Sequence, residues 1–249
     1  MTEYACGIDI GGSGVKGGVV DLSTGELVSD VASVRTPVPS TPASVTAACG
    51  EVLEILGVSA DTPVGITFPA PIKKGIIPFI ANLDESWVGV NIAELMSKQL
   101  GRSVVVINDA DAAALGEVYF GAARGVPGEV IVTTLGTGIG SGVIVDGRLI
   151  PNVELGHLEI DGFDAETRAS ARVKTAENLS WEQFAQRLQR YYSFVEMLFS
   201  PDLFVVGGGV SENHEKFMPL LNLRTPIIPA SLQNKAGIVG GACAATGRM

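Results

Sequence analysis

The stretch IGGSGVKGGVVDL, residues 10–22, has a counterpart half a chain later in LGTGIGSGVIVDG, residues 135–147. In each stretch, an apolar segment typical of a β-strand is followed by a loop of glycines and a hydroxyl residue. A second run then begins with glycine and continues with β-branched residues. The first glycines, Gly11 and Gly136, lie 125 positions apart in a chain of 249 residues. Chance similarity of two glycine-rich hairpins is the alternative. We instead expect two lobes of one strand–turn–strand design that face each other across a cleft.

The first glycine loop matches the dinucleotide-binding pattern G-x-G-x-x-G through Gly12, Gly14 and Gly17. That pattern requires a helix after the loop, because the pyrophosphate sits at the N-terminus of that helix. Here glycines and β-branched residues follow, which are poor helix formers. The sequence therefore predicts a tight turn instead, in which backbone N–H groups, the Ser13 hydroxyl and Lys16 hold phosphate oxygens. A merely structural hairpin is the alternative.

Three loops are candidates for binding a phosphate donor. Asp9 ends the strand before the first loop and is placed to orient Mg²⁺ through water. A third glycine loop follows the apolar segment 203–206 and allows close backbone approach. The candidate donor-binding residues are Asp9, Gly11, Gly12, Ser13, Gly14 and Lys16 in the first loop, Gly136, Thr137 and Gly138 in the second, and Gly208 and Gly209 in the third.

Strand and helix patterns alternate along the chain, and each half opens with a hairpin, which predicts an α/β protein with mixed sheets. We expect strands at residues 5–10, 17–22, 26–29, 33–36, 63–68, 103–107, 129–135, 142–146, 148–150, 203–206 and 226–229. We expect helices at residues 44–56, 92–100, 109–119, 180–199, 211–221 and 236–246. The helix at 180–199 has Ser180 as its N-cap and Gln183 at the capping-box position.

Composition excludes several classes of protein. The net charge is 17 − 27 = −10, which argues against a general nucleic-acid binder. No apolar run is long enough to cross a bilayer, and the N-terminus lacks the pattern of a signal peptide, so we expect a cytoplasmic protein. The three cysteines are widely spaced with no CxxC, which indicates neither disulfides nor a structural zinc site.

Two polar clusters are candidates for chemistry on an alcohol. Asn108-Asp109 stands where a predicted strand becomes a helix, and Asp109 there can accept a proton from an attacking hydroxyl. An N-cap aspartate is the alternative. Glu154 and His157, with acidic residues after them, suggest a pocket for several hydroxyl groups.

These motifs together resemble the ROK (repressor, open reading frame, kinase) family of sugar kinases. DIGGSGVKGG, NDADAAALGE, LGTGIGSG, ELGH and VVGGGVS occur in the family's order, and the resemblance covers most of the chain from Gly7 to Gly209. The resemblance implies a two-lobed, actin-like ATPase or ribonuclease H-like α/β fold with a central cleft. We expect residues 1–108, completed by the helix at 236–249, to form the small lobe, and residues 109–235 to form the larger one.

The resemblance also implies a sugar site with Asp109 as the base on the 6-hydroxyl. The family's sugar contacts correspond to Asn82, Asn108, Asp109, Glu154 and His157. A last glutamate usually follows a zinc motif of three cysteines, which here reads DGFDAETRAS without cysteine. Glu166 is the best match to that glutamate and Glu159 the alternative, and we expect no zinc.

The segments ITFPAPIKKGII, NDADAAALGE and ELGHLEIDG resemble one branch of the family, the bacterial polyphosphate glucokinases. The resemblance implies a homodimer that uses polyphosphate and Mg²⁺ to phosphorylate glucose, and some members of this branch also use ATP or accept mannose. A strictly ATP-dependent glucokinase and an amino-sugar kinase are the alternatives within enzymes. A non-catalytic sugar sensor and an actin-like assembly protein are alternatives from other classes.

Overall fold

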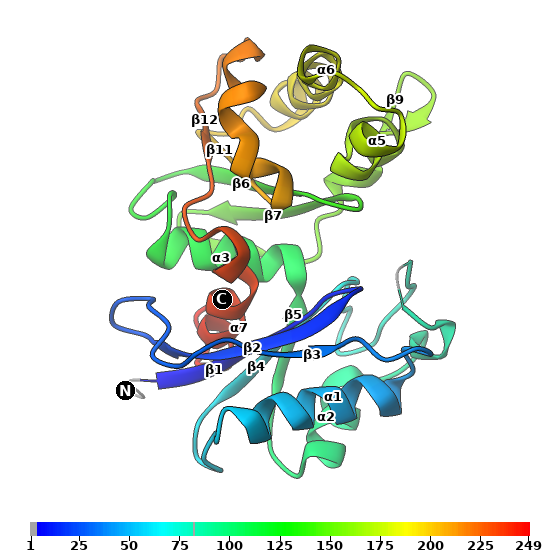
Figure 1. Cartoon of the computed structure of the whole chain (residues 1–249). Coiled ribbons are helices and arrows are strands. Elements are labelled where there is room, and N and C mark those ends of the chain that lie inside the picture. Colours follow the sequence, from blue (N-terminus) through cyan, green and yellow to red (C-terminus); the bar gives the residue numbers. More distant parts are fainter. Residues whose placement is uncertain (1–3, 82) are drawn as a thin grey trace. The chain divides into compact units, whose positions relative to one another are not determined.

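The computed structural model describes residues 4–81 and 83–249. The chain forms two compact units, residues Met1–Gly116 with Lys235–Met249, and residues Glu117–Asn234. The expected boundary after Asn108 falls inside unit one, at the start of a helix. Each unit contains its own sheet and helices (Figure 1).

Unit one is built on a five-stranded mixed sheet of order β3-β2-β1-β4-β5. Its strands are β1 (Tyr4–Ile10), β2 (Gly14–Asp21), β3 (Ala32–Arg35), β4 (Val64–Phe68) and β5 (Val105–Asn108). The first three are antiparallel, whereas β4 and β5 run parallel to β1. Helices α1 (Pro42–Ile55) and α2 (Ile92–Leu100) cover one face of the sheet and α7 (Ala236–Ala245) covers the other (Figure 1).

Glycines allow α7 to approach the sheet of unit one backbone to backbone. A Cβ on Gly7 of β1 would overlap the carbonyl oxygen of Ile238, and one on Gly65 of β4 would overlap that of Gly241. On α7 itself, a Cβ at Gly240 would overlap the carbonyl oxygen of Ala112 in α3 (Asp109–Phe120). Any side chain at these three positions would push the helix away from its partners.

Unit two repeats the design of unit one in its sheet of order β12-β11-β6-β7-β8. The strands are β6 (Glu129–Leu135), β7 (Ile139–Val145), β8 (Arg148–Ile150), β11 (Leu203–Gly207) and β12 (Ile227–Pro229). Here too the first three strands are antiparallel, and β11 runs parallel to β6 and β12. The predicted strand–turn–strand repeat and the mixed α/β sheets are thus confirmed.

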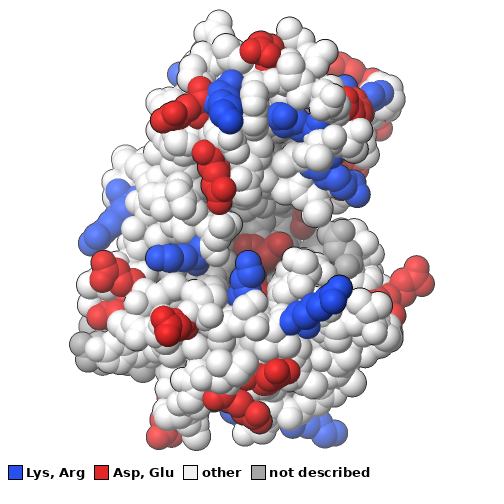
Figure 2. Space-filling view, in the orientation of Figure 1, with Lys and Arg blue, Asp and Glu red and all other residues white. Residues whose placement is uncertain are grey.

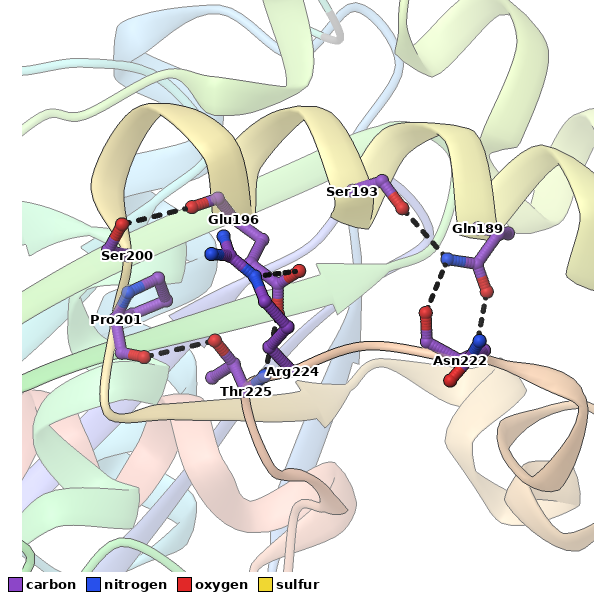
Figure 3. A network of polar contacts seen from close by, with 8 residues as sticks. All are labelled: Gln189, Ser193, Glu196, Ser200, Pro201, Asn222, Arg224 and Thr225. Carbon is purple, nitrogen blue, oxygen red and sulfur yellow. Dashed lines mark hydrogen bonds and ion pairs between the residues drawn. The ribbon is translucent and has the colours of Figure 1, made fainter.

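The longest helix of unit two, α6 (Trp181–Phe199), begins at the predicted capping box of Ser180 and Gln183. Its side chains also fix the segment that leads into β12 (Figure 3). The Gln189 amide accepts a hydrogen bond from the N–H of Asn222 and donates one to its carbonyl oxygen. Glu196 accepts from the N–H of Thr225 at 2.6 Å, so α6 holds this segment at two points about two helical turns apart.

Several predicted elements differ in the structure. Residues 26–29 form only an isolated bridge, Val20 to Leu27, and the third strand of the sheet is β3. The helix predicted at 211–221 is two 3₁₀ segments, Gly209–Lys216 and Met218–Leu220, because Asn213 is non-helical and Pro219 follows. Several short elements of the described residues were not predicted: β9 (Glu159–Ile160), β10 (Phe163–Asp164), α4 (Glu166–Ala169), α5 (Ala171–Ala176) and the 3₁₀ segments Glu85–Trp87, Leu155–His157 and Gln233–Lys235.

Two surface properties bear on possible partners. Acidic and basic side chains are interspersed over the face drawn in Figure 2. Within the described residues, every helix is too short or too polar to cross a membrane.

Candidate active site

In unit one, the first glycine loop is a tight connection between two antiparallel strands. The N–H of Gly11 donates to the carbonyl oxygen of Gly14 at 3.0 Å, and the Thr36 hydroxyl donates to the carbonyl oxygen of Gly11. Gly12 and Ser13 at its tip are exposed. A strand follows the loop, so the rejection of the dinucleotide pattern is confirmed.

Asp9 lies beside this loop at the end of β1. Its Oδ1 accepts a hydrogen bond from the Thr67 hydroxyl at 2.5 Å, and Lys16 is its partner across the β1–β2 ladder. Burial raises the pKa of Asp9, while the bond from Thr67 and the charge of Lys16 oppose the rise. Gly237 leaves room for this carboxylate, since a Cβ there would lie 2.9 Å from the carboxyl carbon. The role predicted for Asp9, holding Mg²⁺ through water, stays a prediction.

Asn108 and Asp109 have different hydrogen-bonding roles at the start of α3. The Asn108 side-chain oxygen accepts the N–H groups of Ala110 at 2.9 Å and Asp111 at 3.0 Å, so Asn108 provides the N-cap. Asp109 is the first residue of the helix and is half-buried, with Oδ1 also accepting from Ala110. Asn108 rather than Asp109 therefore accepts the two N–H groups of an N-cap, and its side-chain oxygen is used in doing so.

In unit two, His157 and Glu154 come from the turn after β8, and Glu166 begins α4. The Glu166 carboxylate accepts from the N–H of Ile139 at 3.1 Å, and a Cβ on Gly138 would overlap it. The predicted donor loop and a predicted sugar ligand are therefore in direct contact. Burial raises the pKa of Glu154, and the nearby Glu166 adds to the rise while His157 opposes it.

Asp164 is a polar residue of this cluster that sequence reasoning missed. Its Oδ2 lies 2.8 Å from His157 Nδ1, and this hydrogen bond is the main cause of a raised pKa for His157. His157, Asp164 and Glu166 bring one ligand atom each within 4.8 Å of one another. The alternative glutamate, Glu159, is exposed on β9. Asn82 lies outside the described residues.

The second and third glycine loops line one pocket of unit two, of about 480 Å³. Its lining includes Gly136, Thr137 and Gly209, and Gly208, next to Gly209 in the chain, has φ = 79°, a conformation that favours glycine. Sequence reasoning missed the other side of the pocket. Its side chains there include Arg172, Lys174 and Trp181, and Lys174 Nζ lies 4.0 Å from the centre of the Trp181 ring.

A comparison with family models identifies the group of proteins to which this chain is related. The model described as "ROK family" matches residues 5–172, more than half of the chain. The chain belongs to the ROK family. The resemblance stated from the sequence motifs is confirmed, and so is the α/β fold that it implied.

Named relatives place this ROK chain close to one kind of sugar kinase. It is 46% identical to a polyphosphate glucokinase of Mycobacterium tuberculosis over 97% of this chain and 91% of the relative. A crystal structure of an inorganic polyphosphate/ATP-glucomannokinase from Arthrobacter sp. strain KM matches with a TM-score of 0.95 and 52% identity, covering 100% of both chains. A ROK-family glucokinase of Streptomyces griseus, solved with glucose and AMPPNP, matches with a TM-score of 0.80 and 26% identity, covering 98% and 99%.

Proposed function

We propose that this ROK chain is a kinase that transfers the terminal phosphoryl group of inorganic polyphosphate to the 6-hydroxyl of glucose, and that it also accepts ATP. The observation that carries the proposal is the likeness over nearly the whole chain to a polyphosphate glucokinase and to a polyphosphate/ATP-glucomannokinase. The glycine loops and the acid at the start of α3 supply the residue types that phosphoryl transfer requires.

Asp109 is the general base in this proposal. Its carboxylate takes the proton of the 6-hydroxyl as that oxygen forms a bond to the terminal phosphorus. The bond between this phosphorus and the bridging oxygen breaks, and the shortened phosphate chain leaves with the electron pair. Asn108 fixes the helix start that presents Asp109, so the base stands on a rigid element.

Mg²⁺ is the proposed metal, held through water by Asp9, with Thr67 orienting the carboxylate. When bound, the ion neutralises charge on the phosphate oxygens. Asp9 offers carboxylate oxygens, the type of group that Mg²⁺ and its bound waters prefer, so this residue fits the ion. The first-loop amides and Lys16, with Gly136–Gly138 and Gly208–Gly209 of unit two, bind the donor phosphates in this proposal.

We propose that Asn82, Asn108, Asp109, Glu154, His157 and Glu166 bind the sugar hydroxyls. No zinc is needed for this, because Asp164 holds His157 Nδ1 and Glu166 is bonded to the Ile139 N–H. Nε2 of His157 is then the ring nitrogen available to the sugar. Elemental analysis of the purified protein tests this part of the proposal, since bound zinc in a one-to-one ratio would contradict it.

Replacing Asp164 by Asn should weaken glucose binding through His157. The Asp164 bond raises the pKa of His157 above its unfolded value of 6.5. The contribution of this bond to the stability of unit two is therefore fully present below pH 6.5, and it is lost as the pH rises through the folded pKa. In Asp164→Asn the pKa should fall toward 6.5 and the glucose dissociation constant should rise about tenfold. NMR titration of the His157 ring and calorimetry check both quantities. Unchanged values for both would exclude this positioning role.

Replacing Lys174 by Gln should affect the donor rather than the sugar. A charge-assisted hydrogen bond contributes about 1.5 kcal/mol or more, so the KM for polyphosphate should rise about tenfold. The KM for glucose should stay the same. Steady-state kinetics in both substrates measures this, with the exposed Lys98→Gln as the control. A rise in the glucose KM alone would show that this pocket does not bind the donor.

A side-by-side assay of donors and sugars tests the proposed function as a whole. Purified protein with Mg²⁺ is given polyphosphate or ATP, each with glucose, mannose or an N-acetyl sugar. Glucose phosphorylated by polyphosphate supports the proposal. Activity with ATP alone would favour the strictly ATP-dependent kinase, and an N-acetyl product would favour the amino-sugar kinase. Sugar binding without any product would favour a sensor, and polymerisation on nucleotide addition an actin-like assembly protein.

We further propose that the protein is cytoplasmic and acts as a homodimer. Sedimentation at micromolar concentration tests the oligomeric state directly. A monomeric mass would contradict the proposed homodimer and would leave the proposed reaction unchanged.

A further inference from the structure

A second pocket in unit two takes no part in the chemistry described above. It has a volume of about 250 Å³ and lies between the β9–β10 hairpin, α4 and α6. We call it the arginine pocket, after the three guanidinium side chains in its lining. Its lining residues are Ile160, Asp161, Phe163, Ala165, Arg168, Ala169, Arg187, Arg190 and Tyr191.

Tyr191, one of the lining residues, has a buried hydroxyl without a partner among the described residues. Tyr191 is 1% exposed, and its hydroxyl forms no hydrogen bond within the described residues. The neighbouring Tyr192 hydroxyl, in contrast, lies 2.6 Å from the Thr133 hydroxyl. Burial keeps the pKa of Tyr191 well above 10, so its hydroxyl retains a proton to donate. A buried group left unsatisfied costs about 1–3 kcal/mol. The hydroxyl oxygen is itself buried, so a small shift of the Tyr191 side chain toward the pocket would bring it to a ligand oxygen and relieve this cost.

The three arginines also keep N–H groups that no described residue uses. Arg190 binds Asp161 through Nε and Nη2, which leaves Nη1. Arg187 binds Glu177 through Nη2 and the carbonyl oxygen of Arg168 through Nη1, which leaves Nε. Arg168 is stacked 3.7 Å from the centre of the Phe163 ring.

Charge and size select the ligand. Three cations against the two carboxylates that pair with them leave an excess of 3 − 2 = 1 positive charge. Guanidinium groups have only donors and a protonated phenol can donate as well, and phosphate oxygens accept several such bonds at once. A volume of about 250 Å³ is below the roughly 300–1,000 Å³ typical of drug-sized ligands, which favours a small anion over a nucleotide.

We propose that the arginine pocket binds a phosphate group, free or as a small phosphate ester, with the Tyr191 hydroxyl and Arg168 among its donors. This site shares no lining residue with the pocket of about 480 Å³ at the second and third glycine loops, which we call the donor pocket.

The anion in this pocket is coupled to the sugar ligands through α4 and the hairpin before it. Pocket residues and sugar-site residues alternate there: Phe163 and Ala165 line the pocket, whereas Asp164 holds His157 and Glu166 binds the Ile139 N–H. A ligand that orders this segment therefore orders Asp164 and Glu166 as well. Phosphate in the pocket should raise the affinity for glucose, a coupling that rests on the proposed sugar site, whereas the anion site itself does not.

The test measures binding, so that it is independent of turnover. Inorganic phosphate is titrated into Lys174→Gln, in which the donor pocket is weakened, and followed by calorimetry and thermal shift. Adding Tyr191→Phe or Arg168→Gln should weaken phosphate binding at least fivefold, while adding Arg148→Gln, an exposed arginine on β8, should not. Tyr191→Phe keeps the ring, and without phosphate it should melt at or above the temperature of its parent.

Three ligands distinguish the source of the phosphate: inorganic phosphate, glucose 6-phosphate and polyphosphate, with the tightest identifying the natural one. Equal phosphate affinity in the Tyr191→Phe, Arg168→Gln and Arg148→Gln proteins would overturn the site. If the site binds but glucose affinity is the same with and without phosphate, the coupling is overturned and the site stands. Neither result depends on whether polyphosphate is the phosphoryl donor, so failure here and failure of the proposed function are distinguishable.

Discussion

Replacing Asp109 by Asn is expected to lower turnover about a thousandfold while glucose still binds. General-base catalysis contributes about 10²–10⁴-fold, and an amide cannot take the proton of the 6-hydroxyl. The fold should be unaffected, because Asn108 rather than Asp109 caps α3, and an Asn side-chain oxygen can still accept the bond from Ala110.

The Asp109→Asn experiment separates binding from chemistry. Glucose affinity is measured by calorimetry and turnover by product formation with saturating polyphosphate. Glu159→Gln is the matched control, since it also exchanges an acid for an amide but at an exposed position on β9. Turnover within tenfold of the parent protein would remove Asp109 from the role of base.

Replacing Gly65 by Ala is expected to destabilise unit one severely. The new Cβ would overlap the carbonyl oxygen of Gly241, and both groups are backbone atoms, in β4 and α7, that no rotamer change can separate. Overpacking of a core costs about 1–3 kcal/mol even where side chains can shift, and more is expected here. A loss of about 3–5 kcal/mol would lower the melting temperature by about 10 °C.

The control for Gly65→Ala is Gly50→Ala in α1. There the new Cβ would meet only the flexible end of Leu100, at 3.4 Å, and Ala favours the helix. Its melting temperature should therefore stay the same or rise. Thermal unfolding followed by circular dichroism measures both variants. Equal melting temperatures would show that α7 does not need this close contact.

The long elements of the fold were predictable because their signals are local. The capping box of Ser180 and Gln183 starts α6, and the repeated glycine loops identify the hairpin that opens each unit. Residues 26–29 were predicted as a strand from their turn and pattern alone. The structure instead pairs β2 with β3, beyond that segment, and this choice depends on tertiary contacts that a local pattern does not contain.

Site residues that belong to a local sequence motif were predictable, whereas residues that reach the site only through the folded chain were not. Asn108 and Asp109 follow from a strand that becomes a helix, and the loops from their glycines. Asp164 was missed because no pattern marks a carboxylate that binds a histidine seven residues earlier through the β9–β10 hairpin. Lys174 and Trp181 were missed because α5 and the start of α6 are brought to the second loop only by the folded chain.

The position of α7 in the chain sets the order in which a nascent polypeptide can fold. The sheet of unit one packs against α7, whose residues are translated after the whole of unit two. Residues Met1–Gly116 therefore leave the ribosome with one face of their sheet uncovered. On that face, Gly7 of β1 and Gly65 of β4 do not yet have α7 packed against them. Unit two, residues Glu117–Asn234, is continuous in sequence and can fold as soon as it emerges. Unit one, which carries Asp109, can thus complete its fold only after α7 has been synthesised.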